Sequence, residues 1–142
     1  MSSHATHTLR KALLPAAIVL MALAFSCTRQ PEEPGAPDRS LIKIGFLGDL
    51  TGPTFNFGKS AYNGVLMAAD EINQGGGING RRIDVVIEDD KGRPEEAARL
   101  TAKLIDQDKV VAIIAGGTSG NSRAAAPKAQ ASHVPLISPS ST

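Results

Sequence analysis

The sequence predicts an α/β fold in which a parallel sheet carries helices on both faces. Between residues 41 and 142, short apolar runs alternate with longer segments whose apolar residues recur at helical spacing. The runs are apolar on both faces, which is typical of strands buried within parallel sheets. Glycine-rich polar loops follow several runs, and parallel sheets bind ligands beyond the carboxyl ends of their strands. We therefore expect right-handed crossovers and a ligand site at that edge.

The first half of this region contains two predicted strands and one predicted helix. Residues 41–48 form the first strand, and a long polar connection follows over residues 49–58. Connections of this length usually carry a function. A helix with one apolar stripe is expected over residues 59–73, and the glycine-rich segment 75–80 ends it. The second strand is expected over residues 82–88.

The second half contains two further helices and two further strands. A helix begins at Pro94, because proline is favoured at the first helical position. The central strand begins at Val110 and ends before Gly116, and it should be buried on both faces. A helix follows from about residue 121 to residue 132, and the last strand spans residues 134–138. The sequence stops soon after this strand, without a further helix, so we expect a fragment of a longer protein.

Residues 1–27 are predicted to be a lipoprotein signal peptide. Arg10 and Lys11 follow a polar start, and a largely apolar run continues over residues 12–25. This run is too short to be a standard transmembrane helix. Removal of the signal peptide would leave a nearly neutral protein, because two basic residues would be lost with it.

Cys27 is the predicted site of lipidation. It stands where the apolar run stops, and residues 23–27 resemble a bacterial lipobox, although the preferred leucine lies one place early, at Leu23. The alternative is ordinary signal cleavage nearby, with an unmodified cysteine. Residues 28–40 are rich in proline and charge and contain no large apolar side chain, so they are predicted to be a disordered tether.

Composition limits the classes of function. The 142 residues are 42% hydrophobic and carry a net charge of +1, so one core can form and nothing attracts nucleic acid. Cys27 is the single cysteine, which excludes an internal disulfide and any metal site built from cysteines.

The loop after the central strand is the main candidate for a binding site. Its glycines allow the backbone to approach a ligand closely. Hydroxyl and amide side chains follow where the next helix opens, on Thr118, Ser119, Asn121 and Ser122. The free N–H groups and positive end of that helix favour a small anion. The same residue types are common helix N-caps, so this loop alone is equally consistent with a structural role.

Taken in order, these features resemble the extracellular solute-binding proteins of ABC transporters for branched-chain amino acids and amides. This leucine-binding-like family has the type I periplasmic-binding fold. The resemblance covers residues 42–142 and is specific because its motifs occur together in order and spacing. These motifs are Ile42-Lys43-Ile44-Gly45, Leu50-Thr51-Gly52-Pro53, Gly76-Gly77-Ile78-Asn79-Gly80, Glu88-Asp89-Asp90, the Gly-Thr-Ser loop and Pro135-Leu136-Ile137-Ser138-Pro139.

The resemblance implies a two-lobed clamp that captures a small amino acid or amide, most often a branched-chain amino acid. Residues 41–142 would be the N-terminal portion of its first lobe. The clamp would deliver the ligand to an ABC permease in the inner membrane. It would work in the periplasm or at the cell surface, as a membrane-anchored lipoprotein.

The resemblance also assigns ligand-binding residues. It implies that the Ser119 hydroxyl binds the ligand carboxylate, and that Phe57 packs on the ligand. The head group would be contacted by Ser140, Ser141 and Thr142. Alternatively, Phe57 packs within its own loop and the two serines cap a following helix. Many relatives have serine at the positions of Gly120 and Asn121 and some have tyrosine or tryptophan at that of Phe57, so ligand identity stays open.

Other polar residues carry weaker signals. We expect Asp89 and Asp90 to form a solvated turn and His133 to lie on the surface. An enzyme is not expected. The segment 45–50 lacks the Gly-x-Gly-x-x-Gly spacing of a Rossmann oxidoreductase, and no nucleophile with an adjacent base is visible. No cofactor and no metal are predicted. The remaining alternative is the ligand-sensing domain of a receptor or regulator with the same fold.

Overall fold

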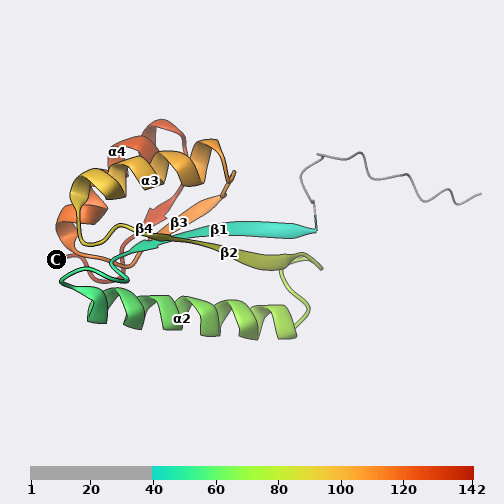
Figure 1. Ribbon diagram of the computed structural model, residues 1–142. Coiled ribbons are helices and arrows are strands. Elements are labelled where there is room, and N and C mark those ends of the chain that lie inside the picture. Colours follow the sequence, from blue (N-terminus) through green and yellow to red (C-terminus); the bar gives the residue numbers. More distant parts are fainter. Residues whose placement is uncertain (1–39) are drawn as a thin grey trace, which may run out of the picture. The chain divides into compact units, whose positions relative to one another are not determined.

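The predicted alternation of strands and helices is confirmed in the computed structural model, which describes residues 40–142 (Figure 1). The strands are β1 (Leu41–Gly48), β2 (Arg82–Asp89), β3 (Ala112–Ala115) and β4 (Leu136–Ile137). The helices are α2 (Phe55–Gln74), α3 (Pro94–Asp106) and α4 (Ser119–Ala131). The predicted signal peptide, Cys27 and the tether up to residue 39 lie outside the described residues.

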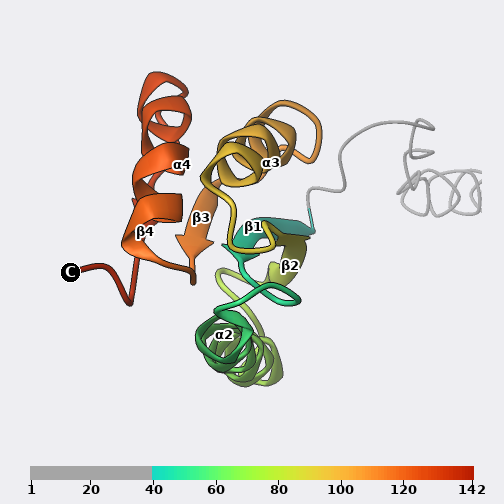
Figure 2. The same ribbon diagram turned by 60° about the vertical axis from the view of Figure 1, so that its left-hand side comes forward.

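The sheet is parallel throughout, with the strand order β2-β1-β3-β4. Figures 1 and 2 show α2 on one face of the sheet and the adjacent helices α3 and α4 on the other. Helices on both faces are expected when β1 lies between β2 and β3, because right-handed crossovers to opposite sides of β1 run over opposite faces. The predicted fold class is therefore confirmed.

The main core lies between the sheet and the pair α3 and α4. Leu47, Leu104 and Ile113 are almost completely buried there. Burial of a side chain of this size contributes about 1.5–3 kcal/mol. Gly45 makes room for this packing, since a Cβ atom at that position would lie 3.1 Å from Leu104 Cδ1.

The opposite face of the sheet is only partly covered. Helix α2 packs on β1 and β2, where Phe46 meets Tyr62 with 5.6 Å between ring centroids. On the same face, Ile114 is half-buried and the side chain of Ile137 is 63% exposed. The expectation that the central strand is buried on both faces is therefore wrong for the described residues, because α2 packs beneath the other half of the sheet.

Helix α2 begins at Phe55, four residues before the predicted start. The cause is Asp49, whose buried carboxylate accepts hydrogen bonds from the backbone N–H groups of Gly52 and Thr54 and from the Thr54 hydroxyl. The chain then turns directly into the helix. The connection after β1 is thus shorter than predicted, and Phe57 lies in the first turn of a helix.

The other boundaries differ from the predictions by about two residues. Strand β3 begins at Ala112, α4 begins at Ser119, and β4 contains two residues. Such shifts are ordinary at the ends of elements. The shift in α4 matters, because it places Ser119 within the first turn of the helix. None of the helices within residues 40–142 has the length and apolar character that crossing a membrane requires.

Candidate functional site

The loops after β3 and β4 meet at the carboxyl edge of the sheet. The Ser140 hydroxyl donates a hydrogen bond to the carbonyl oxygen of Gly117, over 2.7 Å. The backbone N–H of Thr142 donates to Ser119 Oγ, over 3.1 Å. These two bonds join segments that are 23 residues apart in the sequence. These bonds bring the loops after β3 and β4 together at the edge where the sequence predicts a ligand site.

The first turn of α4 presents unpaired donors at this edge. Thr118 is the N-cap, with extended backbone and no capping hydrogen bond from its side chain. Within residues 40–142, the backbone N–H groups of Ser119, Gly120 and Asn121 have no hydrogen-bond acceptor. The Ser119 hydroxyl accepts from Thr142, so its own proton remains available. This arrangement suits a carboxylate, because the positive end of a helix favours a negative charge.

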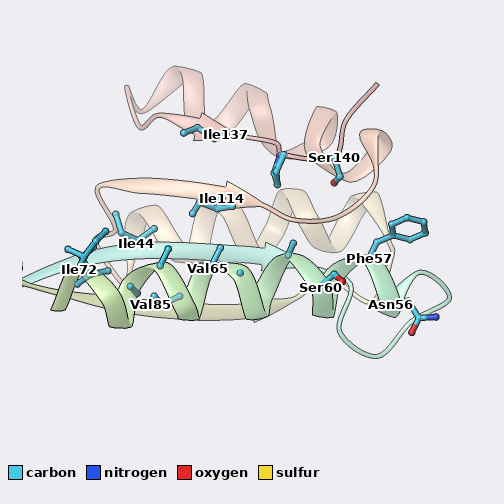
Figure 3. Close-up of a pocket in the computed structure, with 16 residues that line it drawn as sticks. Ile44, Asn56, Phe57, Ser60, Val65, Ile72, Val85, Ile114, Ile137 and Ser140 are labelled. Atoms are coloured by element: carbon cyan, nitrogen blue, oxygen red, sulfur yellow. The ribbon is translucent and has the colours of Figure 1, made fainter. Parts of the chain in front are cut away.

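An apolar groove of about 830 Å³ lies between α2 and the partly uncovered face of the sheet, and Pro139 and Ser140 of the loop after β4 form part of its lining. Figure 3 shows Phe57 and Ser140 toward one end of the groove and Ile72 at the other. Phe57 is 67% exposed, so it does not pack within its own loop, as one interpretation proposed. The groove thus joins an aromatic side chain to the polar loop after β4.

The sequence-predicted site residues fall into two groups. Thr118, Ser119, Ser140 and Thr142 lie together where the two loops are joined. Ser141 lies in the same segment, and its hydroxyl shares a hydrogen bond with the Ser138 hydroxyl. Phe57 lies apart from this cluster, on α2, and shares the groove lining with Ser140.

Two residues that the sequence suggested for the binding loop point inward. Asn121 is 3% exposed and Ser122 is 6% exposed. The Ser122 hydroxyl pairs with the Ser138 hydroxyl over 2.9 Å. Side chains of the first turn of a helix point in different directions, so only Thr118 and Ser119 remain half-exposed at the edge.

Sequence reasoning missed two polar residues that line the groove, Asn56 and Ser60. Both belong to the first turns of α2 and are four residues apart, which places them on one helix face. Their spacing is a usable signal only when the helix is known to begin at Phe55. The predicted start at residue 59 concealed it.

The expectation that Asp89 and Asp90 form a solvated turn is wrong. Asp90 is completely buried, and Asp89 accepts hydrogen bonds from Leu50 N, Thr51 Oγ1 and Lys91 N. Burial alone raises the pKa of Asp89, but these hydrogen bonds together lower it below its ordinary value. Burial also raises the pKa of Asp90, which stays above its ordinary value.

The two aspartates therefore belong to the framework below the site. Asp89 is the last residue of β2 and Asp90 follows it. Asp89 ties the end of β2 to the loop after β1, and Asp90 donates its backbone N–H to the carbonyl of Gly48 at the end of β1. Within residues 40–142, no group of three or more histidine, cysteine, aspartate or glutamate side chains is arranged to hold a metal ion.

Comparisons with known proteins point to one family. The family model described as periplasmic binding protein matches residues 41–142. An amino acid binding protein of Pseudomonas aeruginosa is 35% identical over 71% of this chain and 27% of its own length. A leucine-, isoleucine-, valine-, threonine- and alanine-binding protein of the same organism is 34% identical, again over 71% of this chain and 27% of its own length.

Solved structures agree with this assignment. LivJ of Streptococcus pneumoniae, in complex with isoleucine, is 44% identical with a TM-score of 0.70, over 72% of this chain and 29% of LivJ. A second structure is a solute-binding protein of an ABC transporter from Rhodopseudomonas palustris, in complex with 3,4-dihydroxybenzoic acid. It is 30% identical with a TM-score of 0.66, and the match covers 72% of this chain and 28% of that protein. This chain therefore spans just over a quarter of the length of these relatives, and it belongs to the periplasmic binding protein family.

Proposed function

We propose that residues 41–142 form the N-terminal part of the first lobe of a solute-binding protein that captures a small amino acid or amide. The observation that carries the proposal is the first turn of α4, where unpaired N–H groups and the Ser119 hydroxyl lie against the loop after β4, which through Ser140 also lines an apolar groove. A ligand with a carboxylate at one end and an apolar body matches both features. The isoleucine in the LivJ complex has this chemistry.

In the proposed binding mode, the carboxylate accepts hydrogen bonds from the α4 N-terminus and from Ser119. Each such bond is charge-assisted and therefore stronger than a bond between neutral groups. Ser140, Ser141 and Thr142 surround the head group, with Thr118 at its side. Phe57 contributes an apolar wall, and its 67% exposure leaves the ring free to meet a ligand.

A branched-chain amino acid is the proposed ligand class, because relatives are named for leucine, isoleucine and valine. The complex with 3,4-dihydroxybenzoic acid shows that a related protein holds an aromatic carboxylic acid. Both ligands carry a carboxyl group. We therefore propose that the carboxylate site is the shared element and that other parts of the site select the body of the ligand.

The proposed role in the cell is transport. The protein would close on its ligand outside the cytoplasm and deliver it to an ABC permease, in line with the ABC transporter protein among its relatives. Cleavage of residues 1–27 and lipidation of Cys27 would anchor it to a membrane. Residues 28–40 would act as the tether between the anchor and the folded part.

The test is isothermal titration calorimetry of the full-length protein with a panel of ligands. The panel contains leucine, isoleucine, valine, a polar amino acid, a short amide and 3,4-dihydroxybenzoate. We expect binding of at least one branched-chain amino acid. The absence of binding heat and of any thermal shift with the whole panel would contradict the proposal.

Ser119→Ala tests the carboxylate contact. We expect this variant to weaken binding by about 1–3 kcal/mol, the usual effect of leaving a buried polar group without its partner. Ser132→Ala is the matched control, because Ser132 is the C-cap at the opposite end of the same helix. Equal affinities for both variants would show that Ser119 does not contact the ligand.

A further inference from the structure

Two buried polar atoms lie without hydrogen bonds beneath the candidate site. One is Oδ2 of Asp90, in the loop between β2 and α3. The other is Nδ2 of Asn121, in the first turn of α4. Asp90 is completely buried and Asn121 is 3% exposed. Among the residues that the structure describes, these are the only buried side-chain atoms of this kind.

The two atoms are close to one point of the binding loop. A Cβ atom built on Gly117 would lie 3.6 Å from Asp90 Oδ2 and 3.9 Å from Asn121 Nδ2. One atom is an acceptor and the other is a donor, so they are complementary. The Asn121 amide is also near enough to lower the pKa of Asp90, although burial has the larger, opposite effect.

The rest of the Asp90 residue is firmly held. Its Oδ1 accepts the N–H of Gly92 over 2.9 Å, its backbone N–H donates to the Gly48 carbonyl, and its own carbonyl accepts the N–H of Arg93. Asp90 is thus fixed to the end of β1 and to the start of α3. It offers a rigid acceptor toward the loop after β3.

We propose that Asp90 and Asn121 form a carboxyl–carboxamide pair that positions the loop Gly116–Ser119 for ligand binding. The pair fixes the first turn of α4 against the loop after β2. The Gly117 carbonyl then meets Ser140, and the Ser119 hydroxyl and the free N–H groups keep their orientation. This inference rests on the proposed function in one respect, since it takes the loop as the ligand site.

A role of this kind accounts for a polar pair in this buried position. Taking a carboxyl group and an amide out of water costs free energy unless they bond to each other or to another partner. An apolar pair of similar size would avoid this cost but would not define one orientation. A donor facing an acceptor defines a single orientation of the loop. A ligand that accepts hydrogen bonds from the N–H groups of the loop requires such a fixed orientation.

The pair can be tested by inverting it. Asn121→Asp places a second carboxyl group against Asp90, in a buried site, so repulsion should displace the loop. Adding Asp90→Asn to this variant restores one donor and one acceptor in exchanged positions. Asp90→Asn alone should be mild, because the Asn121 amide can turn its oxygen toward the new amide.

The first readout needs no ligand. Hydrogen–deuterium exchange of the full-length protein is measured on the peptide that covers residues 116–122, with residues 75–80 as the reference segment. We expect Asn121→Asp to speed exchange in residues 116–122 by about tenfold, with the reference unchanged, and the double variant to return it near the original rate. Uniform acceleration in both segments, or no recovery in the double variant, would overturn the proposal.

The second readout is the affinity for isoleucine, by calorimetry. We expect Asn121→Asp to weaken binding by about tenfold and the double variant to recover most of the loss. If the loop exchanges as expected in every variant while the original protein does not bind isoleucine, the positioning pair is supported and the choice of ligand is wrong. If isoleucine binds equally well to all variants, the pair does not position the site.

Discussion

Gly58 provides a sharp test of how α2 is placed against the sheet. It is buried in the first turns of α2, and a Cβ atom there would lie 1.8 Å from the carbonyl oxygen of Asp49. This is more than 1 Å closer than real Cβ atoms approach backbone. Gly58→Ala therefore forces the start of α2 away from the loop after β1, and the contact cannot be relieved by rotation of a flexible side chain.

The magnitude follows from two opposing effects. Overpacking of this kind costs typically about 1–3 kcal/mol, occasionally more. In the opposite direction, the intrinsic preference of alanine over glycine within a helix stabilises the folded state by about 1 kcal/mol. The contact at Gly58 is with backbone and is very short, so the overpacking cost should lie at the upper end of this range or above it. We therefore expect Gly58→Ala to lower the free energy of unfolding by about 2 kcal/mol or more.

Gly64→Ala is the matched control within the same helix. Nothing lies within 4 Å of a Cβ atom at Gly64, so only the helix preference acts. We expect this variant to raise the free energy of unfolding by about 0.5–1 kcal/mol. The measurement is urea-induced unfolding of the full-length protein, followed by circular dichroism. If both variants were stabilised alike, the close packing of α2 on Asp49 would be refuted.

Two further predictions concern the connections between layers. Asn73 holds α2 to β2 through both amide atoms, since Oδ1 accepts the N–H of Ile83 over 2.7 Å and Nδ2 donates to its carbonyl over 2.9 Å. Asn73→Ala should therefore lower the free energy of unfolding, measured in urea, by about 1–3 kcal/mol. Asn63 is at an exposed position of the same helix, so Asn63→Ala should leave the free energy of unfolding unchanged. Equal effects of the two substitutions would contradict this role of Asn73. Hydrogen bonds lower the pKa of Asp89 in the folded protein below its ordinary value of 3.8. The ionised Asp89 carboxylate should therefore contribute its full stabilisation above pH 3.8, and this stabilisation should disappear as the pH falls through the folded-state pKa. In Asp89→Asn, the free energy of unfolding should fall less between pH 6 and about 2 than in the original protein. The same dependence of the free energy of unfolding on pH in both proteins would contradict the role of the hydrogen-bonded carboxylate.

The partly uncovered sheet face shows how the candidate site depends on packing between elements. Ile114 and Ile137 border the same groove as Phe57, and their exposure follows from the position of α2 under β1 and β2. An apolar run predicts a buried strand, but it does not say which half of a sheet a helix covers. The groove could not be predicted from the runs themselves.

Much of the candidate site could nevertheless be anticipated. The polar loop after β3 was predicted as the site because glycines and hydroxyl residues follow an apolar strand there. Parallel strands end at the same edge of a sheet, so the loop after β4 is expected near this site as well. The hydrogen bonds that join Ser119 to Thr142 and Ser140 to Gly117 agree with that reasoning.

The sequence by itself determined the class of fold, because the spacing of apolar residues and the position of glycines are local properties of the chain. It also indicated the edge at which a ligand would bind. Only the tertiary structure decided that Asp49 starts α2 at Phe55, that Asp90 and Asn121 are buried together, and that Phe57 stays exposed. These features depend on contacts between residues distant in sequence, and a polar residue looks the same in a sequence whether water or a neighbouring loop surrounds it.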